Sequence, residues 1–424
     1  MPGRRSLWCV VLPWARSSMK YTARSLQFQR PDGTAIRMRF VASLAVFRYF
    51  GAWTWAVRCR TAQVFLFMSL ANIFGLDRSR LEEFVLSLGE PKYRAGQLYQ
   101  WLYAHRARTF GEMTNLPQPL RDKLAGSAVI GQLGVAASQS SAADGTRKFL
   151  FELSDGRRIE SVLIPPRPTA ADADERMTLC VSTQVGCALD CSFCATATMG
   201  FIRNLSPGEI VGQLFAAEAV SGRTVTNIVF MGMGEPMLNY DNVMTAVELL
   251  TDQTGIGISP KRITLSTAGY ADRIRRMADE DRKIKLALSL HSLRGDVRTA
   301  LMPITKKFSP DELLQALEYY QKRTRKSVML EYIVFDGVND TDEDVRLLVK
   351  ASRRIECRVN LIPFHSIDFT GAGGRTASLR GAPPEGIDAF WKKLRSHGVT
   401  VFIRNSAGVD IDAACGQLAV RTTQ

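Results

Sequence analysis

Residues 81–102 carry apolar side chains at helical spacing. Gly89, Glu90 and Pro91 interrupt the stretch once, so the pattern predicts two helices rather than one. The periodic apolar positions are Leu81, Phe84, Val85, Leu88, Leu98, Trp101 and Leu102. A further helix is expected after Pro117. Together these elements predict a helical accessory domain over residues 68–135.

The pattern changes from helical spacing to alternation between residues 146 and 164. A turn sequence, SDG at 154–156, divides two short apolar runs. The alternating apolar positions are Phe149, Phe151 and Leu153 before the turn, and Ile159, Val162 and Leu163 after it. The sequence therefore predicts a small β-hairpin subdomain over residues 144–166, which links the helical domain to the rest of the chain.

After an exposed Pro-rich loop at 165–176, apolar runs of strand length alternate with helical stretches. Six strands are expected, at residues 179–184, 225–231, 262–267, 284–290, 328–335 and 357–362. Helices are expected from Pro207, Tyr240 and Ala271, near Pro310 and Thr341, and over 389–396, followed by a strand at 400–404. Repeated βα units predict an α/β fold with a parallel sheet. Six strands are fewer than the eight of a closed barrel, so we expect a partial barrel over 177–420, with functional residues after the strand carboxyl ends.

The first 67 residues differ from the rest. They hold eleven of the 55 basic residues, one of the 41 acidic residues and four of the six tryptophans, with no sustained period. Two explanations compete: an organelle transit peptide, or upstream sequence translated from a start placed too early. We favour the second, because Met68 opens a well-patterned segment. We expect a non-core leader and a cytoplasmic protein, with a plastid or mitochondrion as the alternative.

Composition limits the remaining classes. The chain has a net charge of +14, but without the leader 44 basic residues face 40 acidic ones, a net of +4, so global charge says little about nucleic acid. An apolar content of 46% in 424 residues suffices for a large core. No uninterrupted apolar run reaches the roughly 18 residues of a membrane helix. The eight cysteines lack the spacing of a disulfide framework, which favours a reducing compartment.

Three cysteines, Cys187, Cys191 and Cys194, follow the first expected strand of the barrel with the spacing C-x3-C-x2-C. A structural zinc site normally has four protein ligands, and no fourth Cys or His is nearby. Buried structural cysteines would not need such regular spacing. Three thiolates fit a 4Fe-4S cluster in which one iron stays open for another ligand.

The triplet, with Phe193 before its last cysteine, resembles the radical S-adenosylmethionine (SAM) superfamily, in which SAM chelates the open iron. Four more stretches resemble one family: DGTRK at 144–148, CVSTQVGC at 180–187, MGMGEP at 231–236 and ACGQL at 414–418. Together they are similar to the adenine-methylating RNA enzymes of the RlmN and Cfr family. The resemblance runs from about residue 68 to near the C-terminus and implies a partial (β/α)6 radical SAM barrel.

The resemblance implies a two-cysteine mechanism that uses two SAM molecules per turnover. Cys415 matches the cysteine that carries the methyl group, and Cys180 matches the thiol that later releases it by forming a disulfide. These two cysteines, 235 positions apart, are therefore expected to be neighbours. Glu160 matches the proton acceptor, although a lone Glu on a hairpin is usually solvated.

The resemblance also implies a set of SAM contacts. Gly234 permits close backbone approach, and Glu235 can accept a hydrogen bond from the SAM amino group. The other matching positions are Ser266, Leu290, His291, Ser292 and His365. Taken alone, His291 is equally consistent with a structural histidine. His365 stands where the family usually has Asn, and imidazole can also donate and accept a hydrogen bond.

The implied activity is methylation of C2 of an adenosine in large-subunit ribosomal RNA, and of the adenosine 3′ of the tRNA anticodon. C8 methylation of the same rRNA adenosine, a non-catalytic iron-sulfur RNA-binding protein and a different radical enzyme are the alternatives. The expected partners are RNA and an electron donor such as flavodoxin or ferredoxin, with no membrane and a monomeric chain. Six basic residues of the helical domain could contact an RNA backbone or form an ordinary solvated face: Lys92, Arg94, Arg106, Arg108, Arg121 and Lys123.

Overall fold

The computed structural model describes residues 70–166, 176–371 and 379–420, together with the backbone of four strands between residues 25 and 57. The chain divides into two units, Met1–Ala71 and Asn72–Gln424. In the first unit, β1 (Ser25–Gln29) pairs with β2 (Ala35–Arg39), and β3 (Leu44–Tyr49) pairs with β4 (Ala52–Val57), both antiparallel. These strands were not predicted from the sequence. The rest of the expected leader, and residues 167–175 of the expected Pro-rich loop, lie outside the described residues.

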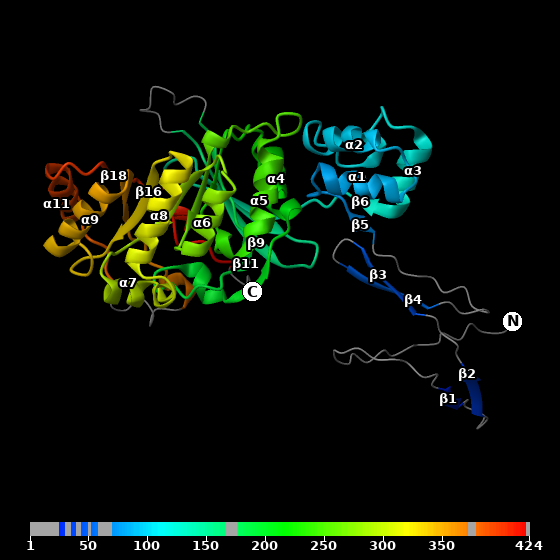
Figure 1. Ribbon diagram of the computed structural model, residues 1–424, viewed down its shortest axis with the longest axis horizontal. Coiled ribbons are helices and arrows are strands. Elements are labelled where there is room, and N and C mark those ends of the chain that lie inside the picture. The colour runs from blue at the N-terminus through cyan, green and yellow to red at the C-terminus, as the bar shows by residue number, and fades with distance from the viewer. Residues whose placement is uncertain are drawn as a thin grey trace. The chain divides into compact units, whose positions relative to one another are not determined.

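The second unit begins with the predicted helical domain (Figure 1), which contains α1 (Arg78–Ser87), α2 (Tyr93–Tyr103), the 3-10 turn η1 (Phe110–Glu112) and α3 (Gln118–Ser127). Short strands β5 (Ala71–Asn72) and β6 (Ala128–Val129) precede and follow these helices in sequence. Asp77 caps α1 by accepting a hydrogen bond from the backbone N–H of Arg80 at 2.8 Å. Most of the predicted apolar positions are buried, namely Leu81, Phe84, Val85, Leu98 and Leu102.

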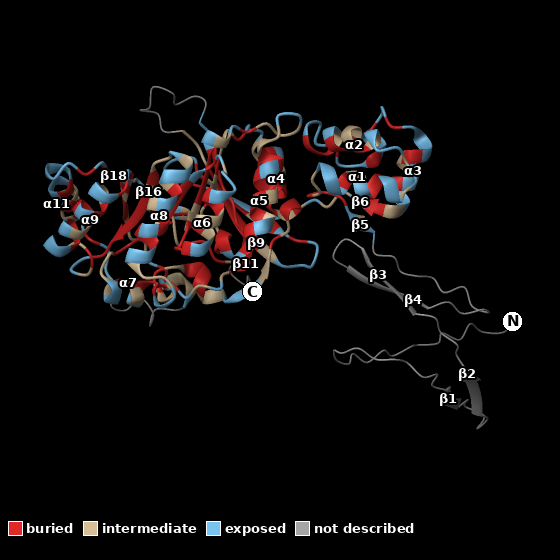
Figure 2. Ribbon diagram, in the orientation of Figure 1, coloured by how far each residue is buried: buried red, intermediate tan, exposed pale blue. Residues whose placement is uncertain are grey.

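A ten-stranded sheet forms the main body, in the order β18-β17-β16-β15-β14-β13-β10-β9-β8-β7. The predicted parallel strands are β10 (Thr178–Cys180), β13 (Asn227–Phe230), β14 (Ile263–Thr267), β15 (Lys285–Ser289), β16 (Val328–Val334) and β17 (Cys357–Pro363). A seventh, β18 (Val401–Ile403), pairs parallel to β17. The described strands leave this sheet open, as expected for a partial barrel. Figure 2 shows that buried residues concentrate along it.

Helices connect the parallel strands, and several start where the sequence predicts. They are α4 (Pro207–Ser221), α5 (Tyr240–Thr251), α6 (Ala271–Asp279), α7 (Gly295–Leu301), α8 (Pro310–Thr324), α9 (Asp342–Arg354) and α11 (Pro384–Ser396). Capping boxes at Ser206, Ser309 and Thr341 fix the first turns of α4, α8 and α9. The 3-10 turns after η1 are η2 (Ala195–Met199), η3 (Pro236–Asn239), η4 (Pro260–Arg262), η5 (Pro303–Lys306), η6 (Asp368–Thr370) and η7 (Val409–Ile411). None of the described helices is long and apolar enough to span a membrane.

The predicted hairpin consists of β8 (Arg147–Glu152) and β9 (Arg158–Ile164), with β7 (Gly134–Ser140) added at its edge. Strand β9 pairs antiparallel with β10, with Cys180 opposite Val162. The hairpin is therefore continuous with the barrel sheet. This pairing brings the strand that carries Glu160 next to the strand that carries Cys180.

The first expected barrel strand, residues 179–184, is two strands in the structure. β10 ends at Cys180, and β11 (Gln184–Gly186) pairs instead with β12 (Phe201–Asn204) in a separate two-stranded sheet. The three-cysteine loop lies between β11 and β12. Its two ends are thus held together by a small sheet immediately beyond the carboxyl end of β10.

Candidate active site

A cavity lies at the carboxyl ends of the parallel strands, where the partial-barrel prediction placed function. Its lining includes eight residues expected from the sequence: Cys187, Cys191, Cys194, Gly234, Glu235, Ser266, His291 and Cys415. Five other expected residues are described by the structure but do not line it: Glu160, Cys180, Leu290, Ser292 and His365. The cavity therefore brings together residues from the cysteine loop, three strand ends and the C-terminal segment.

The three loop cysteines are largely withdrawn from solvent. Cys191 is buried, and Cys187 and Cys194 are half-buried. Burial raises the pKa of all three thiols, to about 12 for Cys187, and the charge of a neighbouring cysteine raises each of them further. Three such thiols can ionise together only beside compensating positive charge, which an iron cluster supplies. The donor set therefore fits the cluster that the sequence predicts.

The spacing of the thiols also bears on the kind of metal. Across residues 70–166, 176–371 and 379–420, no three His, Cys, Asp or Glu side chains are close enough to bind a single metal ion. In a 4Fe-4S cluster each cysteine binds a different iron, so its ligands stand further apart than those of one ion.

Gly186 fixes the start of the cysteine loop. Its φ of +72° lies in the left-handed region, and a Cβ atom there would be 1.8 Å from the carbonyl oxygen of Gly200. The backbone N–H of Cys187 donates to this same oxygen at 3.0 Å. A side chain at position 186 would therefore push apart the strands that hold the loop.

Gly186→Ala is expected to lower the iron content of the purified protein sharply, because the Cβ clash displaces Cys187. Iron and acid-labile sulfide would be measured on anaerobically purified protein. Gly156→Ala is the matched control, since Gly156 has a similar φ of +76° but no atom within 4 Å of its Cβ position. That control should carry only the left-handed strain of roughly 1 kcal/mol and retain its iron. Equal iron loss in both variants would contradict the role of the clash.

Glu235 is buried in the loop that follows β13. Its carboxylate accepts hydrogen bonds from Thr267 Oγ1 at 2.7 Å and from the backbone N–H groups of Ala268 and Met237 at 2.8 and 3.0 Å. Burial raises the pKa of Glu235, and these bonds act against that rise. A carboxylate has about four lone-pair positions, so one stays available to an ammonium group in the cavity. Gly234, at φ +97°, leaves room for the Gln184 side chain.

His291 lines the cavity as a neutral imidazole. Its Nδ1 accepts a hydrogen bond from the Ile333 N–H at 3.0 Å, which leaves Nε2 as the protonated nitrogen. Burial, assisted by the charge of Arg298, lowers the pKa of His291 to about 3. The ring packs edge-on against Phe193 of the cysteine loop, with centroids 4.7 Å apart. His291 can therefore donate a hydrogen bond but does not act as a cation near neutral pH.

The neighbours of His291 have different surroundings. Leu290 and Ser292 are fully buried, and the Leu290 carbonyl accepts a hydrogen bond from Arg298 Nε at 3.0 Å. Arg298 also donates to Thr305 and to the carbonyls of Ala268 and Ser289, so it ties together the loops that follow β14 and β15. Burial lowers the pKa of Arg298 to about 10. Leu290 and Ser292 thus shape the loop, whereas Ser266 lines the cavity directly.

His365 contacts the C-terminal part of the chain. Its Nε2 lies 2.6 Å from the hydroxyl of Ser406, and burial lowers the pKa of its imidazole. The position that usually carries Asn in the family is therefore joined here to the segment after β18. Its expected contact with SAM stays a prediction.

The segment that carries Cys415 is hydrogen-bonded to the cysteine loop, and Cys415 is near enough to Cys180 to affect it electrostatically. The backbone N–H of Ala195 donates to the Gly416 carbonyl at 2.7 Å, and Thr196 Oγ1 donates to the Leu418 carbonyl at 2.6 Å. Burial and then the Cys415 thiolate raise the pKa of Cys180 to about 12. Both cysteines are free thiols. The structure thus brings together two cysteines that the sequence separates by 235 positions.

Two charged residues in this site were missed from the sequence. Arg404 and Glu331 line the cavity, and their side chains form an ion pair with Nη1 and Oε2 3.6 Å apart. The Cys415 thiolate, opposed by burial, raises the pKa of Arg404, and the charge of Glu331 adds to this. Arg404 therefore lies in the same cavity wall as Cys415 and is held there by Glu331. A Glu within the apolar run 328–335 was the signal that sequence reasoning passed over.

Glu160 is buried rather than solvated. Its Oε2 accepts a hydrogen bond from the Ala419 N–H at 3.0 Å, and its Oε1 lies 3.6 Å from Lys148 Nζ. Ala419 is four positions beyond Cys415. The predicted proton acceptor is thus attached to the segment that carries the predicted methyl carrier.

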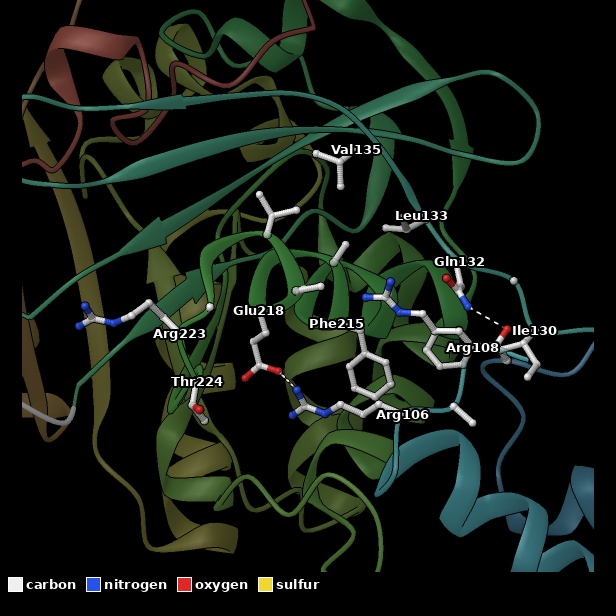
Figure 3. Close-up of a pocket in the computed structure, with 18 residues that line it drawn as sticks. Arg106, Arg108, Ile130, Gln132, Leu133, Val135, Phe215, Glu218, Arg223 and Thr224 are labelled. Carbon is white, nitrogen blue, oxygen red and sulfur yellow. Dashed lines mark hydrogen bonds and ion pairs between the residues drawn. The ribbon is translucent and has the colours of Figure 1, made fainter. Parts of the chain in front are cut away.

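Most of the six basic residues named from the sequence contact other residues of this chain, chiefly within the helical domain. Figure 3 shows Arg106 directed at Glu218 of α4, with its guanidinium 4.9 Å from the centre of the Phe215 ring. Lys92 pairs with Glu82, and Lys123 pairs with Glu90. Arg94 contacts Gln97 and Arg121 contacts the Gly111 carbonyl, whereas the described hydrogen bond of Arg108 involves its backbone carbonyl. These contacts favour the interpretation of an ordinary helix face for most of the set.

Comparison with known proteins decides the family. Residues 71–130 match the ribosomal RNA large subunit methyltransferase N-terminal domain, and residues 181–349 match the radical SAM superfamily. A probable dual-specificity RNA methyltransferase RlmN from Flavobacterium psychrophilum is 43% identical over 352 residues, which are 82% of this chain and 97% of the relative. The chain belongs to the RlmN family of radical SAM RNA methyltransferases.

A second relative and a solved structure agree with this assignment. A dual-specificity RNA methyltransferase RlmN from Desulfosudis oleivorans is 44% identical over 82% of this chain and 90% of its own length. The crystal structure of a radical SAM methyltransferase from Sphaerobacter thermophilus has a TM-score of 0.74 and 40% identity, covering 82% of this chain and 99% of that one. As an RlmN-family enzyme, this protein methylates RNA, and its superfamily implies a 4Fe-4S cluster and SAM.

Proposed function

We propose that this RlmN-family enzyme methylates C2 of a specific adenosine in large-subunit ribosomal RNA and of the adenosine 3′ to the anticodon in tRNA. The observation that carries the proposal is the position of Cys415, whose segment is hydrogen-bonded to the cysteine loop and whose thiolate influences Cys180. A cysteine that carries the methyl group must lie near the cysteine loop, where SAM would bind. It must also lie near Cys180, because the methylated base is released when these two cysteines form a disulfide.

Cys187, Cys191 and Cys194 would hold the cluster, and Glu235, Ser266 and His291 lie where they can bind SAM in the same cavity. When bound, the cluster and two SAM molecules per turnover supply a methyl group and a carbon-centred radical. Arg404 lines the same cavity as Cys415, and a thiolate is the form of a cysteine able to accept a methyl group. The lining leaves Cys415 half-buried and accessible from the cavity.

The later steps assign one role to each remaining residue. After a hydrogen atom leaves the methyl group on Cys415, its carbon forms a bond to C2 of the adenine. Glu160 accepts the proton from that ring carbon. The unpaired electron left on the ring passes to the one-electron carrier that serves the enzyme, which restores the aromatic ring. The Cys180 thiolate then attacks the sulfur of Cys415, the sulfur–carbon bond breaks with its electron pair on the carbon attached to the base, and a proton completes the methyl group there. The enzyme is left with a disulfide that a cellular thiol reduces.

Product analysis tests the reaction. Large-subunit rRNA fragments and tRNA transcripts would be incubated with reconstituted enzyme, SAM and a reductant, digested, and compared by liquid chromatography and mass spectrometry with 2-methyladenosine and 8-methyladenosine standards. We expect 2-methyladenosine, and none with Cys415→Ser. Formation of 8-methyladenosine would show that C8 rather than C2 is methylated. Deoxyadenosine formation without RNA methylation would refute the proposed substrate.

We further propose a monomeric cytoplasmic enzyme that takes electrons from flavodoxin or ferredoxin. The free state of Cys180 and Cys415, like that of the three loop cysteines, supports a reducing compartment. A 4Fe-4S cluster bound by the cysteine loop would need an electron donor of low reduction potential.

A further inference from the structure

Three side chains of the β7–β9 extension hold the C-terminal segment 408–419. Asp144 Oδ2 accepts a hydrogen bond from the Gly408 N–H at 2.9 Å, and Lys148 Nζ donates to the Asp412 carbonyl at 3.3 Å. Glu160 Oε2 accepts from the Ala419 N–H at 3.0 Å. Cys415 lies between the second and third of these attachments. Its placement over the cavity therefore depends on the strands that precede the barrel.

Lys148 joins two of the attachments. Its ammonium contacts both the segment, at Asp412, and the carboxylate of Glu160, with Nζ and Oε1 3.6 Å apart. The side chains of Lys148 and Glu160 are only 12% and 8% exposed. Charges so far removed from water are screened weakly, and each is costly without the other.

The strand register explains why Lys148 reaches this position. Lys148 is opposite Val162 and Leu150 is opposite Glu160, so Lys148 and Glu160 are diagonal neighbours on one face of the sheet. Phe149 and Phe151 alternate to the other face, where they are fully buried. Lys148 therefore lies on the same face of the sheet as Glu160, opposite to the face that buries Phe149 and Phe151.

We propose that Lys148 is a positioning residue that keeps Glu160 ionised and fixes the segment bearing Cys415 in register with it. The inference rests on the proposed function, because it concerns the step in which Glu160 accepts the ring proton. In that step the carbon–hydrogen bond breaks, an O–H bond forms on Glu160, and the electron pair stays in the ring.

The elements next to Glu160 carry several titratable groups. Lys148 lies on β8, Cys180 lies on β10, which pairs with β9, and the C-terminal segment attached to Glu160 carries Asp410, Asp412 and Cys415. Lys148 Nζ lies 3.6 Å from Oε1 of the Glu160 carboxylate. Without this cation the buried carboxylate stays protonated to higher pH, and a protonated Glu160 cannot accept the ring proton. The acidic limb of the pH–rate profile should therefore move upward.

The test compares Lys148→Met and Lys148→Arg with wild type and with Glu160→Gln, using cluster-loaded enzyme, RNA and SAM. We expect Lys148→Met to form S-methylcysteine at position 415 as wild type does, but to accumulate a covalent RNA adduct there. Its acidic limb should rise by about one pH unit or more. Lys148→Arg should restore both properties in large part. Arg158→Met is the matched control, since it removes the more exposed Arg158–Glu152 pair of the same two strands.

Each outcome bears on the proposal. If Lys148→Met loses S-methylation and RNA methylation equally and keeps its pH profile, Lys148 has only a structural role and the proposal is overturned. Wild-type behaviour of Lys148→Met would also overturn the proposal. If Lys148→Met is insoluble, Lys148→Gln provides the same comparison with a smaller loss of polarity. Failure of the proposed function is distinct: wild type would then give no S-methylcysteine, and Glu160→Gln would give no adduct.

Discussion

Replacing Cys180 with alanine is expected to leave the enzyme covalently attached to RNA through Cys415. In the proposed reaction, the bond between the Cys415 methylene carbon and the base persists until the Cys180 thiolate attacks the sulfur. Cys180 is buried, and Cys415 is the described cysteine whose charge raises its pKa. The variant should yield less than a single methylated adenosine per enzyme molecule. Denaturing gels and intact-protein mass spectrometry would show an RNA-shifted species that survives denaturation.

Two controls make the result specific. Cys180→Ala combined with Cys415→Ala should show no adduct, because the carbon carrier is absent. Cys357→Ala removes another buried cysteine, on β17 and outside the cavity lining, and should turn over normally. Normal multiple turnover by Cys180→Ala would refute the assignment of the resolving thiol. An adduct attached at any residue other than Cys415 would refute the carrier.

Cys191→Ala is expected to remove the cluster and all radical chemistry. Cys191 is the most deeply buried of the three loop cysteines, and it packs in one apolar cluster with Phe193, Ile333 and Ile362. Loss of its thiolate leaves two ligands, too few to retain a cluster that is already open at one iron. Iron, sulfide and the visible absorption band should fall to background, together with 5′-deoxyadenosine formation.

A neighbouring residue supplies the comparison for this variant. Ser192→Ala changes the same loop but removes only a weak contact, from the hydroxyl to the Leu301 carbonyl at 3.4 Å. It should retain iron and activity. A Cys191→Ala protein that kept its iron and still cleaved SAM would show that the cluster is held elsewhere.

The barrel was predictable because its signals are local. Apolar runs of strand length marked all six predicted strands, and capping residues such as Ser309 and Thr341 marked helix starts. The division of residues 179–184 between β10 and β11 was not predictable, because it depends on pairing with β12, which follows the cysteine loop. Helix α7 was missed since it has only seven residues and begins with Gly295. Local propensity does not report long-range pairing.

The site divides in the same way. The spacing of Cys187, Cys191 and Cys194 predicts a cluster from eight consecutive residues, and all three line the cavity. Glu160 looked like a solvated residue because hairpin alternation alone cannot show that β9 joins β10 and that the C-terminal segment covers it. Arg404 gains its significance from Cys415 and Glu331, which come from other segments of the chain. Residues whose role arises only from assembly were beyond the reach of pattern reasoning.

The hydrogen bonds from Ala195 to Gly416 and from Thr196 to Leu418 tie the methyl-carrying segment to the residues that directly follow Cys194. Damage to the cluster by oxygen is therefore expected to loosen both parts of the site together. An air-inactivated enzyme would neither generate radicals nor load Cys415 with a methyl group. Loss of the cluster would therefore stop the reaction before SAM is consumed and before any RNA is covalently attached to the enzyme.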